Sequence, residues 1–346
     1  MAGLIIIGSN PTANILRLAC EKIGLNKLAQ IPTRYTPLVP ATILPANISR
    51  VIVALTSEEQ LRDLSIIPNR KMVRLGKSGY LISEIPLGKF YCDRYGANLV
   101  NISEANLQLL LSDQTQSDQE NVLEGYDVDQ NVIALTDQAM REGKTKAYFS
   151  TYYAKLPLDK NSAPINTTWL GQKQIAFQFS TEETQHIVFL IPSDENIDPN
   201  QWHHSIRDAA GSALIQKPNA PKNPFDLDVS LLRSAVRLGS AWYQESWLFP
   251  ETIHAGIEDA WVLSRMLENY EEETNEALSN YTKYRLPRMN RFTKFTDSES
   301  SKLLNTGGAQ RFAQHLRLAF STRFIPEIFI SSQDWLHGYD CLRGFR

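Results

Sequence analysis

The chain has 346 residues, of which 42% are hydrophobic and 21% are charged. This much apolar material can build a sizeable core, which excludes intrinsically disordered and fibrous proteins. The formal net charge of -3 argues against a nucleic-acid partner bound mainly through its phosphates. The length fits two domains, or one large α/β unit with an insertion.

Hydropathy and cysteine content give no sign of a membrane span or a metal site. No apolar run approaches the roughly 18 residues that a membrane span needs, and the N-terminal apolar run meets Gly8 too early for a signal peptide. The three cysteines, Cys20, Cys92 and Cys341, are far apart and form no CxxC or Cys/His cluster. We therefore expect a soluble cytoplasmic protein without a metal.

The N-terminal segment has the pattern of a strand, a tight turn and a helix. Residues 4–7 are a continuous apolar run, typical of a strand buried on both faces of a parallel sheet. The turn that follows starts at Gly8. Ser9 or Asn10 can cap the next helix, Pro11 suits its first turn, and Gly24 ends it. Dinucleotide-binding folds place G-x-G-x-x-G here. Gly8 keeps the first glycine, whereas Asn10 and Ala13 replace the others, so the turn is either a phosphate-binding loop or a well-capped helix start.

The next hundred residues give a mixed pattern. Residues 31–50 contain four prolines and little periodicity, so they are predicted to be loop. Residues 50–55 fit either a strand or a helix start. The remaining predictions in this part are a helix over 56–66, paired strands over 70–90, a helix over 103–112 and an exposed polar connection over 112–121.

From residue 145 to 195 the pattern changes to β. Strands are predicted over 147–153, 167–170, 174–179 and 186–191. Helices are predicted over 199–216, 256–284 and 286–318. The chain is therefore expected to be an α/β protein that contains a β-rich block.

Three motifs in the last third carry a resemblance to a known family. They are Gly239-Ser240-Ala241, Ile257-Glu258-Asp259-Ala260 and Tyr281 followed by Arg285-Leu286-Pro287-Arg288. Their order resembles the aromatic-hydroxylase type of flavin monooxygenase, near salicylate hydroxylases and ubiquinone-pathway hydroxylases, whose members carry G-D-A-A-H, I-E-D-A and Y-x-x-x-R-x-P-R. Weaker collinear matches over 90–111, 148–159, 169–194 and 334–340 extend the resemblance almost end to end.

The resemblance implies a shortened aromatic-hydroxylase fold, in which a β-sheet substrate domain is inserted into an FAD/NAD(P)-binding Rossmann-like domain. The discontinuous dinucleotide-type domain would comprise 1–69, 93–142 and 229–346. The β-rich substrate-type domain would comprise 70–92 and 143–228.

The same resemblance indicates that most positions that contact FAD in the family are altered here. Ser240 replaces an Asp near the ribityl or pyrophosphate group, Ile31 replaces the acid that ends the second strand, and Glu104 replaces an Arg. Further replacements are Pro32 for a basic residue, Leu135-Thr136 for a D-G motif, Trp247 for the Pro beside the flavin ring, Glu251-Thr252 for Gln-Gly, Trp242 for a small residue and Tyr243 for a His. Only Gly8, Ala13 and Gly239 remain compatible with cofactor binding. Three or four such losses would cost about 5–10 kcal/mol, or roughly four to seven decades in affinity.

Aromatic side chains crowd the stretch that would border the flavin ring. They are Trp242, Tyr243, Trp247 and Phe249. They either fill the vacated ring space, which avoids a cavity penalty, or form an ordinary aromatic surface loop.

Candidate site residues fall into two groups. Tyr152, Tyr153, Trp169, Phe177 and Trp247 are predicted to line a substrate pocket, with plain core packing as the alternative, and Tyr153 stands where relatives often have Arg. His254 and Glu258 lie four residues apart, so they are weak catalytic candidates for a general base and its carboxylate, or simply a structural pair. His203-His204 and Glu271-Glu272-Glu273 are interpreted as solvated residues.

Three functional hypotheses follow. The leading one is a pseudoenzyme with no expected cofactor, which acts as a binding or partner protein for an intact flavin hydroxylase or a small aromatic ligand. The second is an FAD-dependent monooxygenase that uses NAD(P)H and O2 to hydroxylate an aromatic ring. The third is a cofactor-free acid–base enzyme on a phenolic or quinone-like substrate, using His254 and Glu258 or Tyr152 and Tyr153.

Overall fold

The structure is a computed structural model. It describes residues 3–25, 27–33, 35–112, 132–136, 148–159, 163–216, 235–243, 246–270, 273–305 and 331–344. Most of the polar connection predicted over 112–121, the last part of the helix predicted over 286–318, and Glu271 and Glu272 lie outside these residues.

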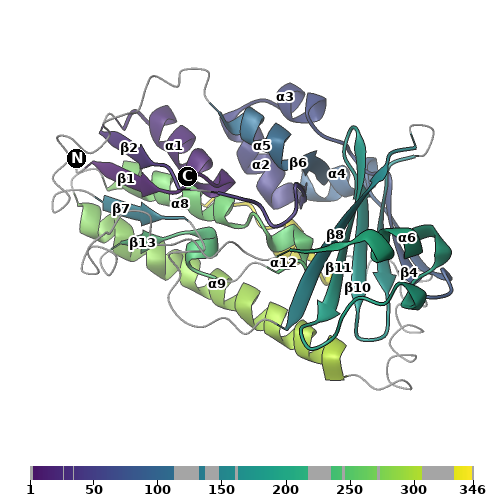
Figure 1. Ribbon diagram of the computed structural model, residues 1–346. Coiled ribbons are helices and arrows are strands. Elements are labelled where there is room, and N and C mark those ends of the chain that lie inside the picture. Colours follow the sequence, from purple (N-terminus) through teal and green to yellow (C-terminus); the bar gives the residue numbers. More distant parts are fainter. Residues whose placement is uncertain are drawn as a thin grey trace.

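A four-stranded parallel sheet forms one end of the molecule (Figure 1). Its strand order is β13 (Val236–Arg237), β7 (Val132–Leu135), β1 (Leu4–Ile7) and β2 (Leu28–Ile31). All four residues of β1 are buried, as expected for a central strand that is covered on both faces. The predicted strand over 4–7 and the helix that follows it, α1 (Pro11–Lys22), are therefore confirmed.

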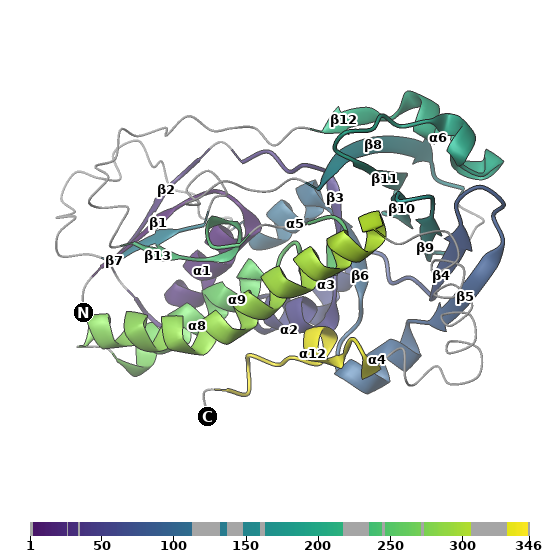
Figure 2. The same cartoon turned by 90° about the horizontal axis from the view of Figure 1, so that it is seen from below.

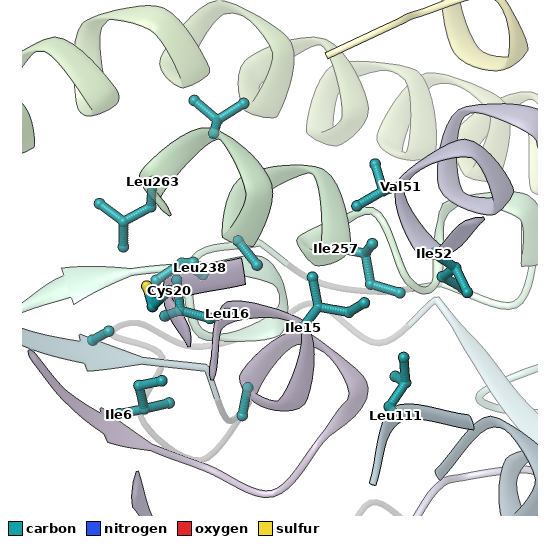
Figure 3. Packing of buried hydrophobic residues seen from close by; sticks show 14 of the residues in the cluster. Ile6, Ile15, Leu16, Cys20, Val51, Ile52, Leu111, Leu238, Ile257 and Leu263 are labelled. Carbon is teal, nitrogen blue, oxygen red and sulfur yellow. The ribbon is translucent and has the colours of Figure 1, made fainter. Parts of the chain in front are cut away.

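Helices cover this sheet and enclose the largest apolar cluster (Figure 3). Ile15 and Leu16 of α1 pack in it with Val51 of α2 (Ala46–Leu55) and with Ile257 and Leu263 of α8 (Gly256–Asn269). The other helices in this region are α3 (Glu58–Asp63) and α5 (Glu104–Leu111). A long helix, α9 (Thr274–Asn305), runs from the parallel sheet to the second sheet (Figures 1 and 2).

The second sheet has seven strands. In order they are β12 (Leu214–Gln216), β8 (Phe149–Pro157), β11 (Thr184–Pro192), β10 (Ile175–Ser180), β9 (Ile165–Leu170), β4 (Arg70–Leu75) and β5 (Leu81–Pro86). All neighbours are antiparallel except β4 and β9. These strands fall within the ranges predicted for the β-rich domain, although the domain boundaries themselves stay a prediction.

The two faces of this sheet are covered differently. Helix α6 (His204–Ser212) and the fully buried Trp202 pack on one face. The other face packs on α4 (Lys89–Tyr95) and on Trp247 and Leu248. Short elements complete the chain: β3 (Ala41–Leu44) paired with β6 (Val100–Ser103), the 3-10 helices η3 (Pro199–Gln201), η4 (Gly239–Ala241) and η5 (Pro250–Thr252), and α12 (Asp334–His337).

Three sequence predictions are wrong. Residues 256–284 are not one helix, because α8 ends at Asn269 and α9 begins at Thr274 and continues through Pro287 to Asn305. Residues 31–50 are not all loop, because they contain β3 and the start of α2. Strand β3 depends on pairing with β6, a partner about sixty residues away that local periodicity does not reveal. Residues 199–216 are not one helix, because 214–216 form the edge strand β12 against β8. Within the described residues, no helix is both long and apolar enough to cross a bilayer.

Candidate functional site

The turn after β1 is closely packed against the end of β7. Gly8 has a φ of +148°, and a Cβ added there would lie 1.9 Å from the hydroxyl oxygen of Thr136. Glycine is therefore required both by its backbone conformation and by the contact with Thr136.

Asn10 satisfies the start of α1 with its own side chain. Its Oδ1 accepts a hydrogen bond from the backbone N–H of Ala13 at 3.0 Å, and its Nδ2 donates to the carbonyl of Thr136 at 2.6 Å. The next residue, Pro11, has no N–H to offer. Anion binding at a helix start depends on backbone N–H groups that point outward. At the start of α1, Pro11 has no N–H, and the N–H of Ala13 is already bonded to Asn10.

The loops after β1, β7 and β13 are joined at the same point. The carbonyl of Thr136 also accepts a hydrogen bond from the Ser240 hydroxyl at 3.0 Å. Next to it, the Gly239 N–H donates to Asp259 at 2.9 Å, and a Cβ on Gly256 would lie 2.4 Å from the Thr12 hydroxyl. The remnant positions Gly8, Ala13 and Gly239 thus lie in a hydrogen-bonded and tightly packed cluster of the protein's own groups.

Two further replaced positions are buried nearby. Ile31 packs with Leu135 and Ala241 in an apolar cluster. Glu104, at the start of α5, is 6% exposed. One oxygen of its carboxylate lies 3.0 Å from Nε2 of His254, and the other accepts a hydrogen bond from the Tyr35 hydroxyl at 3.3 Å.

The contacts described for His254 and Glu258 lead to different partners, and the catalytic role predicted for the two residues stays a prediction. Helix α8 begins at Gly256, and His254 precedes it, so helical i, i+4 spacing does not apply to this pair. His254 pairs with Glu104 instead.

Glu258 and Asp259 belong to a buried cluster with two arginines of α9. Glu258 lies 2.9 Å from Arg285 and 2.6 Å from Arg288, and Asp259 lies 2.5 Å from Arg285. Burial by itself would raise the pKa of Glu258, but Arg288 and Arg285 outweigh it and lower that pKa. For Asp259 burial prevails and the pKa is raised, although Arg285 opposes the shift. The I-E-D-A and R-x-P-R motifs therefore join α8 to α9, a pairing that their complementary charges could have indicated.

The aromatic stretch packs into the interior rather than forming a surface loop. Trp247 is 7% exposed and stacks on Phe179 of β10, with 6.1 Å between ring centroids and 17° between planes. Tyr243 is buried and lies 5.7 Å from the ring of Phe292. Trp242 is only half-buried and contacts Tyr281.

The five predicted pocket residues do not lie on one surface. Tyr152 and Trp169 belong to the face that α6 covers, whereas Tyr153, Phe177 and Trp247 belong to the opposite face. Tyr152 and Tyr153 are consecutive in β8, and consecutive strand residues point to opposite faces. One pocket cannot contain all five. Whether Tyr153, Phe177 and Trp247 bind a ligand stays a prediction.

No metal site was found in the described part of the chain. It contains no group of three or more His, Cys, Asp or Glu side chains placed to hold an ion.

The neighbouring histidines His203 and His204 contact each other. His203 also lies 2.9 Å from the Ser205 hydroxyl.

The sequence matches no family model and no curated protein, but solved structures match it over almost its full length. HpxO of Klebsiella pneumoniae, complexed with FAD and uric acid, is 14% identical with a TM-score of 0.74, covering 96% of this chain and 95% of that one. A salicylate hydroxylase in a substrate complex is 13% identical with a TM-score of 0.69, covering 98% and 96%. The fold is that of the FAD-dependent aromatic hydroxylases. PqsL of Pseudomonas aeruginosa, described as a probable FAD-dependent monooxygenase, is 13% identical with a TM-score of 0.66, covering 93% and 100%.

The predicted hydroxylase fold is therefore confirmed, and its cofactor region can be compared with the contacts that the resemblance assigns to FAD. The start of α1 is capped by Asn10, the second strand ends in the buried Ile31, and Glu104 puts a carboxylate where a cation is expected. The residues present do not fit FAD held in that way.

Proposed function

We propose that this hydroxylase-fold chain does not hold FAD in the manner of the family and acts as a binding or partner protein. Its ligand would be a small aromatic molecule, or its partner an intact flavin hydroxylase. The hydroxylase fold is compatible with binding either a small aromatic molecule or a partner protein. The altered cofactor region supports the loss of flavin binding.

The side chain of Asn10 is the observation that carries this proposal. A diphosphate at the start of α1 would compete with the Asn10 cap of Ala13 and with its hydrogen bond to Thr136. Losing a cap costs about 1 kcal/mol, and an unpaired buried polar group costs about 1–3 kcal/mol more. Like charges repel, so the Glu104 carboxylate would add an unfavourable interaction with any phosphate near it.

The test is a visible absorption spectrum of the full-length protein, recorded after incubation with excess FAD and gel filtration. We expect no flavin band to remain with the protein. HpxO, treated in parallel, serves as the flavin-binding control. A flavin band that co-elutes with this protein in stoichiometric amount would refute the proposal.

A second candidate function is an FAD-dependent aromatic-ring monooxygenase. It is favoured by the structural neighbours, among which HpxO was solved with FAD. It requires FAD to bind in a pose that avoids Asn10 and Glu104. FAD-dependent oxidation of NAD(P)H by the purified protein would support it, and no oxidation at high FAD would count against it.

A further inference from the structure

The last part of the chain is more basic than the rest. Residues 274–346 contain eleven Lys and Arg and six Asp and Glu, whereas the whole chain has a formal net charge of -3. Such charge asymmetry within a chain is typical of proteins that contact nucleic acid or a membrane surface. The exposed cations of this part are therefore candidates for an interaction surface.

Helix α9 supplies six of these eleven cations, and one of its faces is exposed. Its buried residues Tyr281, Arg285 and Phe292 hold the opposite face against the molecule. Residues three or four apart share one side of a helix. The exposed residues linked by this spacing include Lys283, Tyr284, Leu286, Pro287, Arg291 and Lys294. The helix lies along the lower side of the molecule in Figure 1, and Figure 2, seen from below, shows it in the foreground.

The cations of this exposed face are not neutralised by neighbouring carboxylates. None of Lys283, Arg291 and Lys294 forms an ion pair with a carboxylate of the residues that the structure describes. The nearest acidic residues along α9 are Glu276, almost two turns before Lys283, and Asp297, three residues after Lys294. The three cations extend along about 16 Å of the helix, at 1.5 Å per residue. They therefore form a positive stripe.

Apolar side chains lie between and beside these cations. Leu286 is 43% exposed and Tyr284 is 39% exposed. The half-buried ring of Trp335 lies with its centroid 4.3 Å from the Arg291 guanidinium. Tyr, Trp and Leu beside Lys and Arg are typical of surfaces that meet the headgroup region of a bilayer. Nucleic acid offers phosphates but no apolar layer for Leu286, whereas a bilayer with anionic lipid offers both.

We infer that the exposed face of α9 is a docking surface for a bilayer that contains anionic lipid, with the helix axis parallel to the membrane. Three basic residues near such a surface predict a preference of about a hundredfold over a neutral bilayer. The contact is peripheral, because no helix of the described residues is long and apolar enough to cross a bilayer. This inference goes beyond the proposed function and requires neither FAD nor an aromatic ligand.

The test is co-sedimentation of the full-length protein with sucrose-loaded vesicles. One set of vesicles contains phosphatidylcholine alone, and the other also contains about 30% phosphatidylserine. At low salt we expect about a hundredfold tighter binding to the vesicles with phosphatidylserine. Raising the salt to about 0.5 M should release the protein, because ions screen the attraction between exposed charges.

Two triple variants distinguish the α9 stripe from general charge attraction. K283Q/R291Q/K294Q neutralises the stripe and should remove the preference for phosphatidylserine. K77Q/K155Q/K173Q is the matched control, because it removes three exposed lysines of the seven-stranded sheet and its turns and gives the same net charge. This control should bind like the unaltered protein.

A second pair of variants tests the apolar part of the contact. Leu286→Gln leaves the charge unchanged and should weaken binding several-fold, since it removes apolar surface from the contact. Leu109→Gln is its control, because Leu109 of α5 is 61% exposed and lies on another helix, and it should leave binding unchanged.

Equal binding to the two kinds of vesicle, no binding to phosphatidylserine at low salt, or equal losses in the two triple variants would overturn the inference. Retention on polyglutamate beads without binding to phosphatidylserine would overturn it in favour of an acidic protein partner. The vesicles contain no FAD and no aromatic ligand, so failure here is distinguishable from failure of the proposed function.

Discussion

The packing of Trp247 tests whether side chains fill the space that the flavin ring would occupy or leave that space open. Replacing it with alanine removes its stack on Phe179 and leaves a void in the core. We expect Trp247→Ala to lower the free energy of unfolding by about 3–5 kcal/mol, the range for large aromatic truncations. Trp242→Ala should cost less, because Trp242 is only half-buried.

Chemical denaturation measures both changes, with Tyr80→Ala as the control. Tyr80 is 69% exposed, so its truncation should change stability by no more than about 0.5 kcal/mol. A Trp247→Ala variant as stable as Tyr80→Ala would contradict the interior placement of this ring.

Two buried histidines predict sensitivity to mild acid. Burial lowers the pKa of His186 and of His337 to about 4, below the value of about 6.5 in an unfolded chain. The unfolded chain therefore binds protons first as the pH falls, and the free energy of unfolding should decrease by about 2 kcal/mol per histidine between pH 6.5 and 5. Denaturation curves across that range, repeated with His337→Gln, should show a shallower pH dependence in the variant. The same slope in both proteins would rule out this role for His337.

The cap of α1 can be tested as a single element. Asn10→Ala removes the bond to Ala13 and leaves the Thr136 carbonyl without its Asn10 donor. We expect a loss of about 1–3 kcal/mol, measured by urea denaturation. Ser57→Ala at the exposed start of α3, where Ser57 caps Gln60, should lose about 1 kcal/mol or less. Asn10→Ala should therefore cost more than Ser57→Ala, and a smaller loss would contradict the double role of Asn10.

Elements set by local pattern could be predicted from the sequence, and elements set by distant partners could not. β1 and α1 follow from an apolar run, a capped turn and Gly24. β3 was missed because its partner β6 is far away in the chain. The same limit applies to the site. The sequence indicated which cofactor positions are altered, but pairing His254 with Glu104 requires bringing together residues 150 positions apart.

At the scale of the whole molecule, the cluster of Glu258, Asp259, Arg285 and Arg288 joins α8 to α9. Because Glu258 is 0% exposed, Glu258→Gln leaves two buried arginines with one carboxylate. We expect a loss of about 3–5 kcal/mol in the free energy of unfolding. Glu84→Gln breaks the exposed pair with Arg70 and should cost no more than about 1 kcal/mol. Similar losses in the two variants would show that the buried cluster has no special weight in stability.

We propose that the protein's own side chains occupy the cofactor region of this hydroxylase fold. An equilibrium titration of FAD fluorescence with the full-length protein tests it most directly. We expect no saturable change in FAD fluorescence up to about millimolar protein, which corresponds to a binding free energy weaker than about -4 kcal/mol. Saturable one-to-one binding at micromolar or lower concentration would contradict it.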